Sequence, residues 1–331
     1  MTDTPLPTEM NVVEISEFGG PEVLVPAKRD LPDLKADEVL VKVTAAGVNM
    51  PDVLQRNGLY PLPPGASDLP GLEISGEVVA TGSNVTQWKI GDRVCGLTKG
   101  GGYAEFVAIA ADHCLPIPAG VDEADAAGLP ETFFTVWSNC FFQQTIEPGG
   151  LFLVHGGAGG IGSTAVQLGA ALGLRVFATV SNAENAAFVK DLGAERAINY
   201  RKEDFVEIVT EQGGAAMILD FIGGDYVGKN LVAAAPDARL VQLAFLQGSK
   251  VEVNLLPIML KRITLTGSTL RPRPGDFKAA IAADLRQHVW PLFAEEKLKA
   301  VTHERFALAD AAKAHAMMEA SGHRGKILLL P

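Results

Sequence analysis

The apolar residues in the first part of the chain fall in short runs separated by turn residues. Between Asn11 and about Pro130 the runs are VLVKVTAAGV (39–48), GEVVATG (76–82), DRVCGL (92–97), YAEFVAI (103–109) and CLPIPAG (114–120). Runs of this length, bounded by Gly and Pro, are typical of β-strands. Their spacing predicts an antiparallel, partly closed β-structure.

The pattern of apolar positions changes at Leu151, from where predicted strands alternate with predicted helices. The strand LFLVH (151–155) leads through a glycine turn into the helix STAVQLGAALG (163–173). The strand RVFATV (175–180) then precedes a helix at about 183–192, which Gly193 can end. The runs AINY, MILDFIG, RLVQLAF and ITLTGS continue the series as buried strands. Strands that alternate with helices predict a parallel, doubly wound sheet and therefore an α/β protein.

The last 60 or so positions follow a third pattern. A longer amphipathic helical region follows Arg271, a helix is predicted over Asp310–Ala320, and an apolar strand over Lys326–Leu330. We expect this tail to pack back on the first domain. The proline-rich stretch Pro61–Pro70 is interpreted as a surface loop.

Length and composition narrow the class of protein. A chain of 331 residues favours two domains, and 47% hydrophobic with 20% charged residues suits a packed enzyme. The formal charge of -11 repels phosphate backbones and anionic lipids, so neither nucleic acid nor membrane partners are expected. The odd count of three cysteines argues against a disulfide framework. With no signal-like N-terminus, a cytoplasmic location is expected.

The turn between the strand at 151–155 and its helix carries the first candidate chemistry. It reads HGGAGGIGS, with Gly157, Gly159 and Gly162 at the spacing of a dinucleotide fingerprint. One glycine permits the tight turn, one lets the backbone touch a pyrophosphate, and one lets helix and strand pack closely. A simple glycine-rich turn remains the alternative. The predicted cofactor-binding residues here are Gly156, Gly157, Ala158, Gly159, Gly160, Ile161 and Gly162.

The end of the next strand indicates which dinucleotide is bound. Ser181 and Asn182 stand where an NAD site places an acidic residue for the ribose hydroxyls. The missing carboxylate leaves room for the 2′-phosphate of NADPH, which Ser181, Asn182, Tyr200 and Arg201 or Lys202 can bind. We therefore predict NADPH as cofactor, with ordinary surface roles as the alternative for each residue.

Several separated segments carry a likeness to a known family. They are GVNMPDVLQRNGLYPLPPG (47–65), PGLEISGEV (70–78), WKIGDRV (88–94), the glycine turn and NYRKEDF (199–205). Together they resemble the zeta-crystallin-like NADPH:quinone oxidoreductases, which are zinc-free medium-chain dehydrogenases/reductases. GLYPLPPGAS, PETFFTVW and GHRGKILL further resemble the tumour-suppressor-inducible quinone oxidoreductase subfamily.

The resemblance implies a fold and an assembly. A chaperonin-like (GroES-like) β-domain, residues 1–126 and 271–331, would enclose a Rossmann NADP-binding domain, residues 127–270. It also implies a homodimer joined along the strand ITLTGS, because pairing two edge strands satisfies their open backbone groups.

Zinc is not expected at the site. Zinc enzymes of the superfamily take ligands from a cysteine in the first domain and from the histidine of a Gly-His-Glu sequence. Asn49 stands in the stretch of that cysteine, and Leu72 replaces the histidine. None of the six histidines has a convincing ligand spacing, and His155, which ends a strand, is interpreted as a packing or hydrogen-bonding residue.

Without a metal, the predicted reaction is hydride transfer to an electron-poor acceptor such as a quinone. The resemblance places Tyr60 beside the acceptor, and Asn49 and Asp52 near the nicotinamide and ribose. Loop packing is the alternative for Tyr60, and a helix cap for Asp52. Further predicted cofactor contacts are Thr135, Ala244, Phe245, Leu246, Ser268, Thr269 and Leu270, although Thr135 and Phe245 also suit buried packing.

The chain departs from its relatives in one respect. The family usually has a lysine soon after the second Rossmann strand that holds the 2′-phosphate, and none occurs at 181–185. The loop leading to Gly325, with His323 and Arg324, is a second source of positive charge, so we predict His323 and Gly325 as cofactor contacts; solvated surface residues are the alternative. Two other functions stay open: an NADPH-dependent enoyl or alkenal reductase, and a nucleotide-binding, crystallin-like structural protein without turnover.

Overall fold

A computed structural model of the chain describes residues 6–144 and 147–331. The chain divides into two units, the first made of residues 1–134 and 271–331 and the second of residues 135–270. The sequence placed the first boundary at 126/127, whereas in the structure it lies within helix α2 (Pro130–Val136). Ala124 and Ala127 pack against Ala45 and Leu328 of the first unit, which explains why the segment before α2 belongs there.

The first unit is built on an antiparallel sheet with one parallel edge pair. Its strand order is β14-β15-β3-β4-β5-β7, and β6 also pairs with β3. The strands are β3 (Glu38–Val48), β4 (Glu73–Thr81), β5 (Arg93–Leu97), β6 (Phe106–Ala110), β7 (Cys114–Pro116), β14 (Thr302–Ala307) and β15 (Lys326–Leu330). A hairpin of β1 (Glu9–Ile15) and β2 (Leu24–Asp30) completes the strands. This is the antiparallel β-structure that the short apolar runs predicted, and it agrees with the GroES-like β-domain that the resemblance implied.

The tail of the chain joins the sheet of the first unit, as the sequence predicted. Strand β15 pairs antiparallel with β3, with Leu328 opposite Gly47, and parallel with β14. The helices of this unit are α1 (Met50–Arg56), α8 (Gly275–His288), α9 (Pro291–Ala294) and α10 (Ala311–Ala320). Aliphatic residues of β3, β4 and β15 form a core cluster of this unit together with α10.

The second unit holds a parallel six-stranded sheet in the order β10-β9-β8-β11-β12-β13. The strands are β8 (Leu151–Val154), β9 (Arg175–Val180), β10 (Arg196–Asn199), β11 (Ala215–Asp220), β12 (Ala234–Gln242) and β13 (Thr264–Gly267). The helices are α3 (Gly160–Ala171), α4 (Ala183–Asp191), α5 (Phe205–Glu211), α6 (Tyr226–Ala233) and α7 (Leu256–Lys261). The order reverses between β8 and β11, which makes the doubly wound Rossmann sheet that was predicted.

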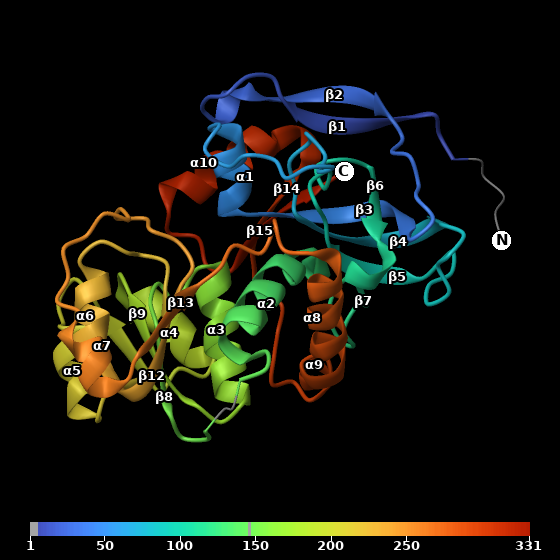
Figure 1. Cartoon of the computed structure of the whole chain (residues 1–331). Helices are drawn as coiled ribbons and strands as arrows, with labels where there is room; N and C mark the ends of the chain where they lie inside the picture. The colour runs from blue at the N-terminus through green and yellow to red at the C-terminus, as the bar shows by residue number, and fades with distance from the viewer. Residues whose placement is uncertain (1–5, 145–146) are drawn as a thin grey trace. The chain divides into compact units, whose positions relative to one another are not determined.

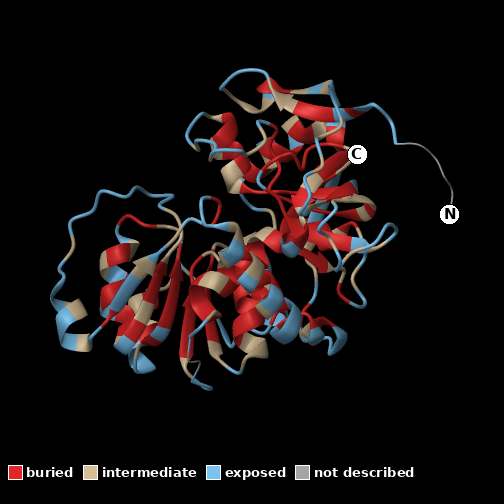
Figure 2. Ribbon diagram, turned by 45° about the vertical axis from the view of Figure 1, so that its right-hand side comes forward, coloured by how far each residue is buried: buried red, intermediate tan, exposed pale blue. Residues whose placement is uncertain are grey.

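Helices cover both faces of this sheet (Figure 1). Phe205 and Val209 of α5 and Leu231 of α6 pack on Leu153 and Ile198. On the other face, Gly169 of α3 lies against Phe152 and Val176, the residues that alternate with those of the first face. The strands in the middle of the sheet are accordingly buried while the helices keep exposed outer faces (Figure 2).

One predicted strand differs in burial from the expectation. ITLTGS was interpreted as a buried strand, but β13 is the last strand of the sheet and Leu265 is 46% exposed. Among the described residues β13 has one partner strand, β12, so its apolar residues are not enclosed within this unit. Among the described residues, no helix is long and apolar enough to cross a membrane.

Candidate active site

Two backbone amides of the glycine turn donate hydrogen bonds to Thr179 of the neighbouring strand β9. The amide of Gly156 donates to Thr179 Oγ1 at 3.0 Å, and the amide of Gly157 donates to the Thr179 carbonyl at 3.0 Å. Gly156 has φ of 60°, a left-handed conformation that favours glycine. Thr179 therefore holds the turn at the carboxyl end of β9, where helix α3 begins.

Two of the three fingerprint glycines are required by the protein itself. A Cβ on Gly157 would lie 2.7 Å from Ala178 Cβ, and one on Gly162 would lie 2.2 Å from the Gly156 carbonyl oxygen. A Cβ on Gly159 would meet only that carbonyl oxygen, at 3.9 Å, and Gly159 has an ordinary φ of -73°. The open space beside Gly159, at the N-terminus of the twelve-residue helix α3, fits a pyrophosphate in contact with the backbone.

The residues predicted for the 2′-phosphate lie on adjacent strand ends. The amide of Tyr200 donates to the Val180 carbonyl at 3.1 Å, which places Tyr200 beside Ser181. Asn182 caps helix α4 by accepting the amide of Asn185 at 2.8 Å, and its own amide lies 3.4 Å from Ser181 Oγ. Asn182 thus has a structural role, while Ser181 and Tyr200 remain partly exposed.

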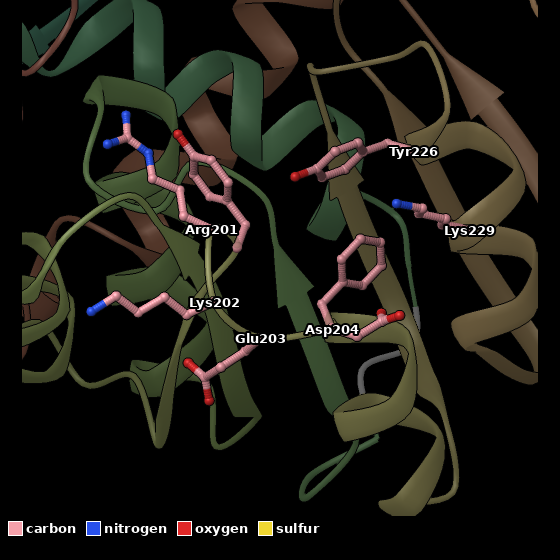
Figure 3. A pocket seen from close by; sticks show the side chains of 8 residues that line it. Arg201, Lys202, Glu203, Asp204, Tyr226 and Lys229 are labelled. Carbon is pink, nitrogen blue, oxygen red and sulfur yellow. The ribbon is translucent and has the colours of Figure 1, made fainter.

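A pocket of about 240 Å³ opens beside Tyr200. Arg201 and Lys202 lie on one side of it, and Tyr226 and Lys229 on the other (Figure 3). Three cations and two carboxylates, those of Glu203 and Asp204, line it. The sequence pointed to Arg201 and Lys202 but missed Tyr226 and Lys229, because they lie on α6, far along the chain.

His155 lies in a buried hydrogen-bond network, as its position at a strand end suggested. Its Nε2 lies 2.8 Å from Asn230 Oδ1, and the Asn230 amide donates to Asp220 Oδ2 at 3.0 Å. Asp220 Oδ1 accepts the amides of Ile222 and Gly223. Burial lowers the pKa of His155. The network ties the turn after β8 to the loop after β11.

The other predicted cofactor contacts of this unit follow strands β12 and β13. Ala244 is half-buried, whereas Phe245 and Leu246 are exposed, so the core alternative for Phe245 is wrong. Ser268 donates to Asn139 Oδ1 at 2.9 Å, and the Asn139 amide donates to the Thr135 carbonyl at 2.9 Å. Thr135 is half-buried, Thr269 is exposed and Leu270 is buried. Asn139, which links Ser268 to Thr135, was not predicted.

In the first unit, Asn49 and Asp52 form a capping box at the start of α1. Asp52 is fully buried and accepts the amides of Asn49 at 2.9 Å and of Gly71 at 3.0 Å. Burial raises the pKa of Asp52 to about 6. Each oxygen accepts one of these amides, which agrees with the cap alternative, and the role beside the ribose stays a prediction.

Asn49 is likewise engaged within the unit. Its amide donates to Glu73 Oε1 at 2.8 Å, and its oxygen accepts from Lys326 Nζ at 2.5 Å. Lys326 Nζ also lies 2.7 Å from Glu73 Oε1 and 3.0 Å from the Val48 carbonyl. Glu73 and Lys326 were not predicted as site residues, although a lone lysine in the apolar strand KILLL indicates that its charge needs a buried partner.

Tyr60 lies in the loop after α1, over the guanidinium of Arg271. The Arg271 Cζ is 5.5 Å from the centre of the Tyr60 ring. Burial raises the pKa of Tyr60, so its hydroxyl keeps its proton at neutral pH. The structure therefore brings Tyr60 together with a cation that was not predicted.

His323 and Gly325 also belong to the first unit. Gly325 has φ of 69°, and a Cβ there would lie 2.3 Å from the Val301 carbonyl oxygen, so the fold alone requires this glycine. Burial lowers the pKa of His323 to about 4, so its ring is neutral at pH 7. His323 thus supplies no positive charge for a phosphate.

The residues at the positions of zinc ligands are unsuited to a metal. Leu72 is buried, and the Lys326 ammonium occupies the space beside Asn49 and Glu73, where it would repel a divalent cation. Within residues 6–144 and 147–331, no three His, Cys, Asp or Glu side chains are grouped so that they could hold a metal ion.

Known families and proteins resemble this chain along nearly its whole length. Residues 35–119 match the family described as alcohol dehydrogenase GroES-like domain, and residues 160–284 match that described as zinc-binding dehydrogenase. Human quinone oxidoreductase is 31% identical, covering 97% of this chain and 98% of its own. A quinone oxidoreductase of Pseudomonas aeruginosa is 33% identical, covering 96% and 99%.

Solved structures extend these similarities. The quinone oxidoreductase of Escherichia coli complexed with NADPH has a TM-score of 0.86 and 30% identity, covering 97% of this chain and 100% of its own. A mycobacterial protein complexed with NADPH has a TM-score of 0.85 and 31% identity, with the same coverage. CurK enoyl reductase, at 26% identity, has a TM-score of 0.84 and covers 98% and 99%.

Proposed function

Because this chain belongs to the quinone oxidoreductase family, we propose that it is an NADPH-dependent oxidoreductase that reduces quinones by hydride transfer without a metal. Full-length similarity to curated quinone oxidoreductases supports the enzyme class. The single observation that supports the site best is the open space beside Gly159, since the protein's own packing does not require a glycine there.

The residues of the second unit suit NADPH. The turn from Gly156 to Gly162 and the N-terminus of α3 would hold the pyrophosphate. Ser181, Tyr200 and the cations beside them would bind the 2′-phosphate, because no carboxylate stands at that strand end to repel it. Two solved relatives of similar fold are complexes with NADPH. When bound, the cofactor supplies the hydride.

The first unit supplies groups for an acceptor that needs no metal. Lys326 and Glu73 form a buried pair that orients Asn49, and Tyr60 presents an aromatic ring. An electron-poor quinone accepts hydride readily, so the protein mainly has to position it. A flat quinone can stack on an aromatic ring such as that of Tyr60.

A second candidate is reduction of α,β-unsaturated carbonyl compounds. The fold similarity to CurK enoyl reductase favours this reaction. In both reactions, hydride adds to an acceptor in which a C=C bond is conjugated with a carbonyl group. The two candidates differ in the acceptor rather than in the cofactor.

The deciding experiment compares acceptors with the purified protein. Oxidation of NADPH and of NADH is followed with a panel of quinones and enals, before and after treatment with a chelator. We expect the highest kcat/KM with a quinone and NADPH, unchanged by chelation. Higher kcat/KM with enals would support the second candidate. Cofactor binding without turnover of any acceptor, the behaviour of a crystallin-like protein, would reject both.

We also propose that two copies of the chain assemble along β13. Leu256, Met259 and Leu260 of α7 and Leu265 of β13 are at least 46% exposed, and β13 is an edge strand. Contiguous exposed apolar residues beside an open strand edge are typical of an interface. Sedimentation of the protein as a dimer, and of Leu265→Glu as a monomer, would support this assembly. A monomeric protein at micromolar concentration would reject it.

The oxidation state of the cysteines indicates the cellular compartment of the protein. Cys95, Cys114 and Cys140 are all free and buried. Unpaired cysteines suit a reducing compartment, so a cytoplasmic location remains our proposal.

A further inference from the structure

The guanidinium of Arg271 is buried without a full set of partners. Arg271 is 7% exposed, and its Nη1 donates to Gln55 Oε1 at 2.9 Å, while Nη2 lies 3.4 Å from the Lys99 carbonyl. Its Nε is buried and has no hydrogen-bond acceptor among the described residues. No carboxylate in the described part of the chain forms an ion pair with it.

Arg56 shows that this unit can satisfy a buried guanidinium. It is 1% exposed, its Nε donates to the Gly19 carbonyl at 3.0 Å, and its Nη2 pairs with Glu319 at 2.7 Å. Buried polar groups are normally paired in this way, and an exception calls for an explanation. At Arg271 the Nε–H and one N–H of each terminal nitrogen have no acceptor among the described residues, so they can donate to a group outside the chain.

Contacts with Lys278 and Gly100 fix the position of Arg271. Its carbonyl accepts from Lys278 Nζ at 2.8 Å, and Lys278 itself is 2% exposed. A Cβ built on Gly100 would lie 3.3 Å from Arg271 Nη2, so the guanidinium packs closely on that backbone. A cation held in this manner needs no reorganisation when a negative charge forms beside it.

Tyr60 covers the guanidinium but is itself weakly held. Its ring centre lies 5.5 Å from Arg271 Cζ, and its hydroxyl makes no hydrogen bond to the described residues. The loop that carries it has no helix or strand and includes Gly58 at φ 72° and Gly65 at φ 74°. Arg side chains stack on flat rings, and a flat acceptor held by the Arg271 N–H groups can contact the Tyr60 ring beside them.

Arg271 carries its positive charge at neutral pH because the pKa of a guanidinium lies far above 7. Burial lowers the pKa of Arg271, but Asp52 and Glu131 act in the opposite direction. Lys278 also lies nearby, and burial lowers its pKa to about 8. Arg271 therefore remains the cation best placed to donate two N–H bonds to an oxygen.

Resting on the proposed function, we propose that Arg271 binds the acceptor oxygen that becomes negative during reduction, with Tyr60 against the acceptor ring. A bound nicotinamide would supply the hydride by breaking its C4–H bond. The hydride bonds to a carbon conjugated with the acceptor carbonyl, the C=C π pair shifts to the bond next to the carbonyl carbon, and the carbonyl π pair moves onto the oxygen. The nicotinamide is oxidised, the acceptor is reduced, and water supplies the proton that neutralises the oxygen. Arg271 thereby stabilises the charge that a zinc ion stabilises in metal-dependent enzymes.

The test compares Arg271→Met and Arg271→Lys with Arg273→Met. Arg273 is an exposed arginine two positions away that lies over Phe277, so its removal controls for lost charge in this segment. We expect kcat/KM for a quinone and for an enal to fall about 100-fold in Arg271→Met, mostly in kcat. Arg271→Lys should recover part of the loss, and Arg273→Met should stay within about twofold.

A readout independent of turnover separates this role from a structural one. The phenolate of 4-nitrophenol absorbs visible light, and a cation beside its oxygen lowers the pKa of the bound phenol. Titration of the protein with this probe should show a lowered probe pKa in the wild type and Arg271→Lys but not in Arg271→Met. Arg271→Met with an unaltered probe pKa, or with kcat/KM within about threefold of wild type, would overturn the proposal.

Two results separate failure of this proposal from failure of the proposed function. If the wild type reduces neither acceptor, the proposed function is wrong, while the probe titration still tests oxyanion binding by Arg271. If Arg271→Met does not fold, the wild type and Arg271→Lys decide: an unshifted pKa of the bound probe in both would overturn the proposal.

Discussion

The ammonium of Lys326 lies 2.7 Å from Glu73 Oε1, in a pair whose side chains are 8% and 0% exposed. The pair connects β15, from the end of the chain, with β4, although β3 separates these strands in the sheet. Both charges are removed from water, so each depends on the other and on Asn49 for its stabilisation.

Removing one member of this pair should strongly destabilise the protein. Lys326→Met leaves the Glu73 carboxylate buried without its cation, so the free energy of unfolding should fall by about 3–5 kcal/mol in urea denaturation. Lys313→Met breaks a pair with Asp310 in which the lysine is 70% exposed, and it should change stability by less than about 1 kcal/mol. Equal effects of both substitutions would contradict the importance of the buried pair.

The fingerprint glycines should separate into binding and folding residues. Gly159→Ala places its methyl group in open space, so thermal stability should stay the same while NADPH binding weakens about tenfold. Gly162→Ala forces a methyl group against the Gly156 carbonyl oxygen and should cost about 2 kcal/mol of stability. Fluorescence titration with NADPH and thermal denaturation measure the two effects. Unchanged NADPH affinity in Gly159→Ala would remove our main support for the pyrophosphate site.

A carboxylate at the end of β9 should reverse the cofactor preference. Ser181→Asp introduces the charge that repels a 2′-phosphate and suits ribose hydroxyls, so kcat/KM with NADPH should fall at least about tenfold relative to NADH. Ser181→Ala, which adds no charge, should change this ratio much less. Steady-state kinetics with both cofactors give the ratio. A tenfold advantage for NADH in the unmodified protein would defeat the NADPH prediction.

The stability of the first unit should depend on pH through Asp52. Burial raises its pKa from 3.8 to about 6, so the folded protein binds this proton more tightly than the unfolded chain. The contribution is therefore fully present below about pH 4 and is lost as pH rises through about 6, an effect of up to about 3 kcal/mol. Asp52→Asn lacks the titrating group. The wild type should thus lose stability relative to Asp52→Asn between these pH values, as measured by urea denaturation, and parallel curves would contradict the assignment.

Patterns among neighbouring residues predicted much of the fold and the glycine turn of the proposed cofactor site. Alternation of apolar and polar residues is a property of neighbouring positions, so the strands of the β-domain and the parallel sheet were found from the sequence. The glycine turn is equally local, because its three glycines serve one strand and one helix. The edge position of β13 was missed, since an apolar run does not reveal how many neighbours a strand has.

The sequence by itself determined most strands of the two sheets, the alternation of strands and helices in the second unit and the turn that suits a pyrophosphate, but not the strands β1, β2 and β14. Only the tertiary structure decided that Asp52 caps α1, that Lys326 reaches Asn49 across 277 positions of chain, and that Tyr60 covers Arg271. The physical reason is that a buried charge takes its partners from whatever segments the fold brings beside it. Those partners are set by the packing of distant strands and loops, and no spacing along the chain records them.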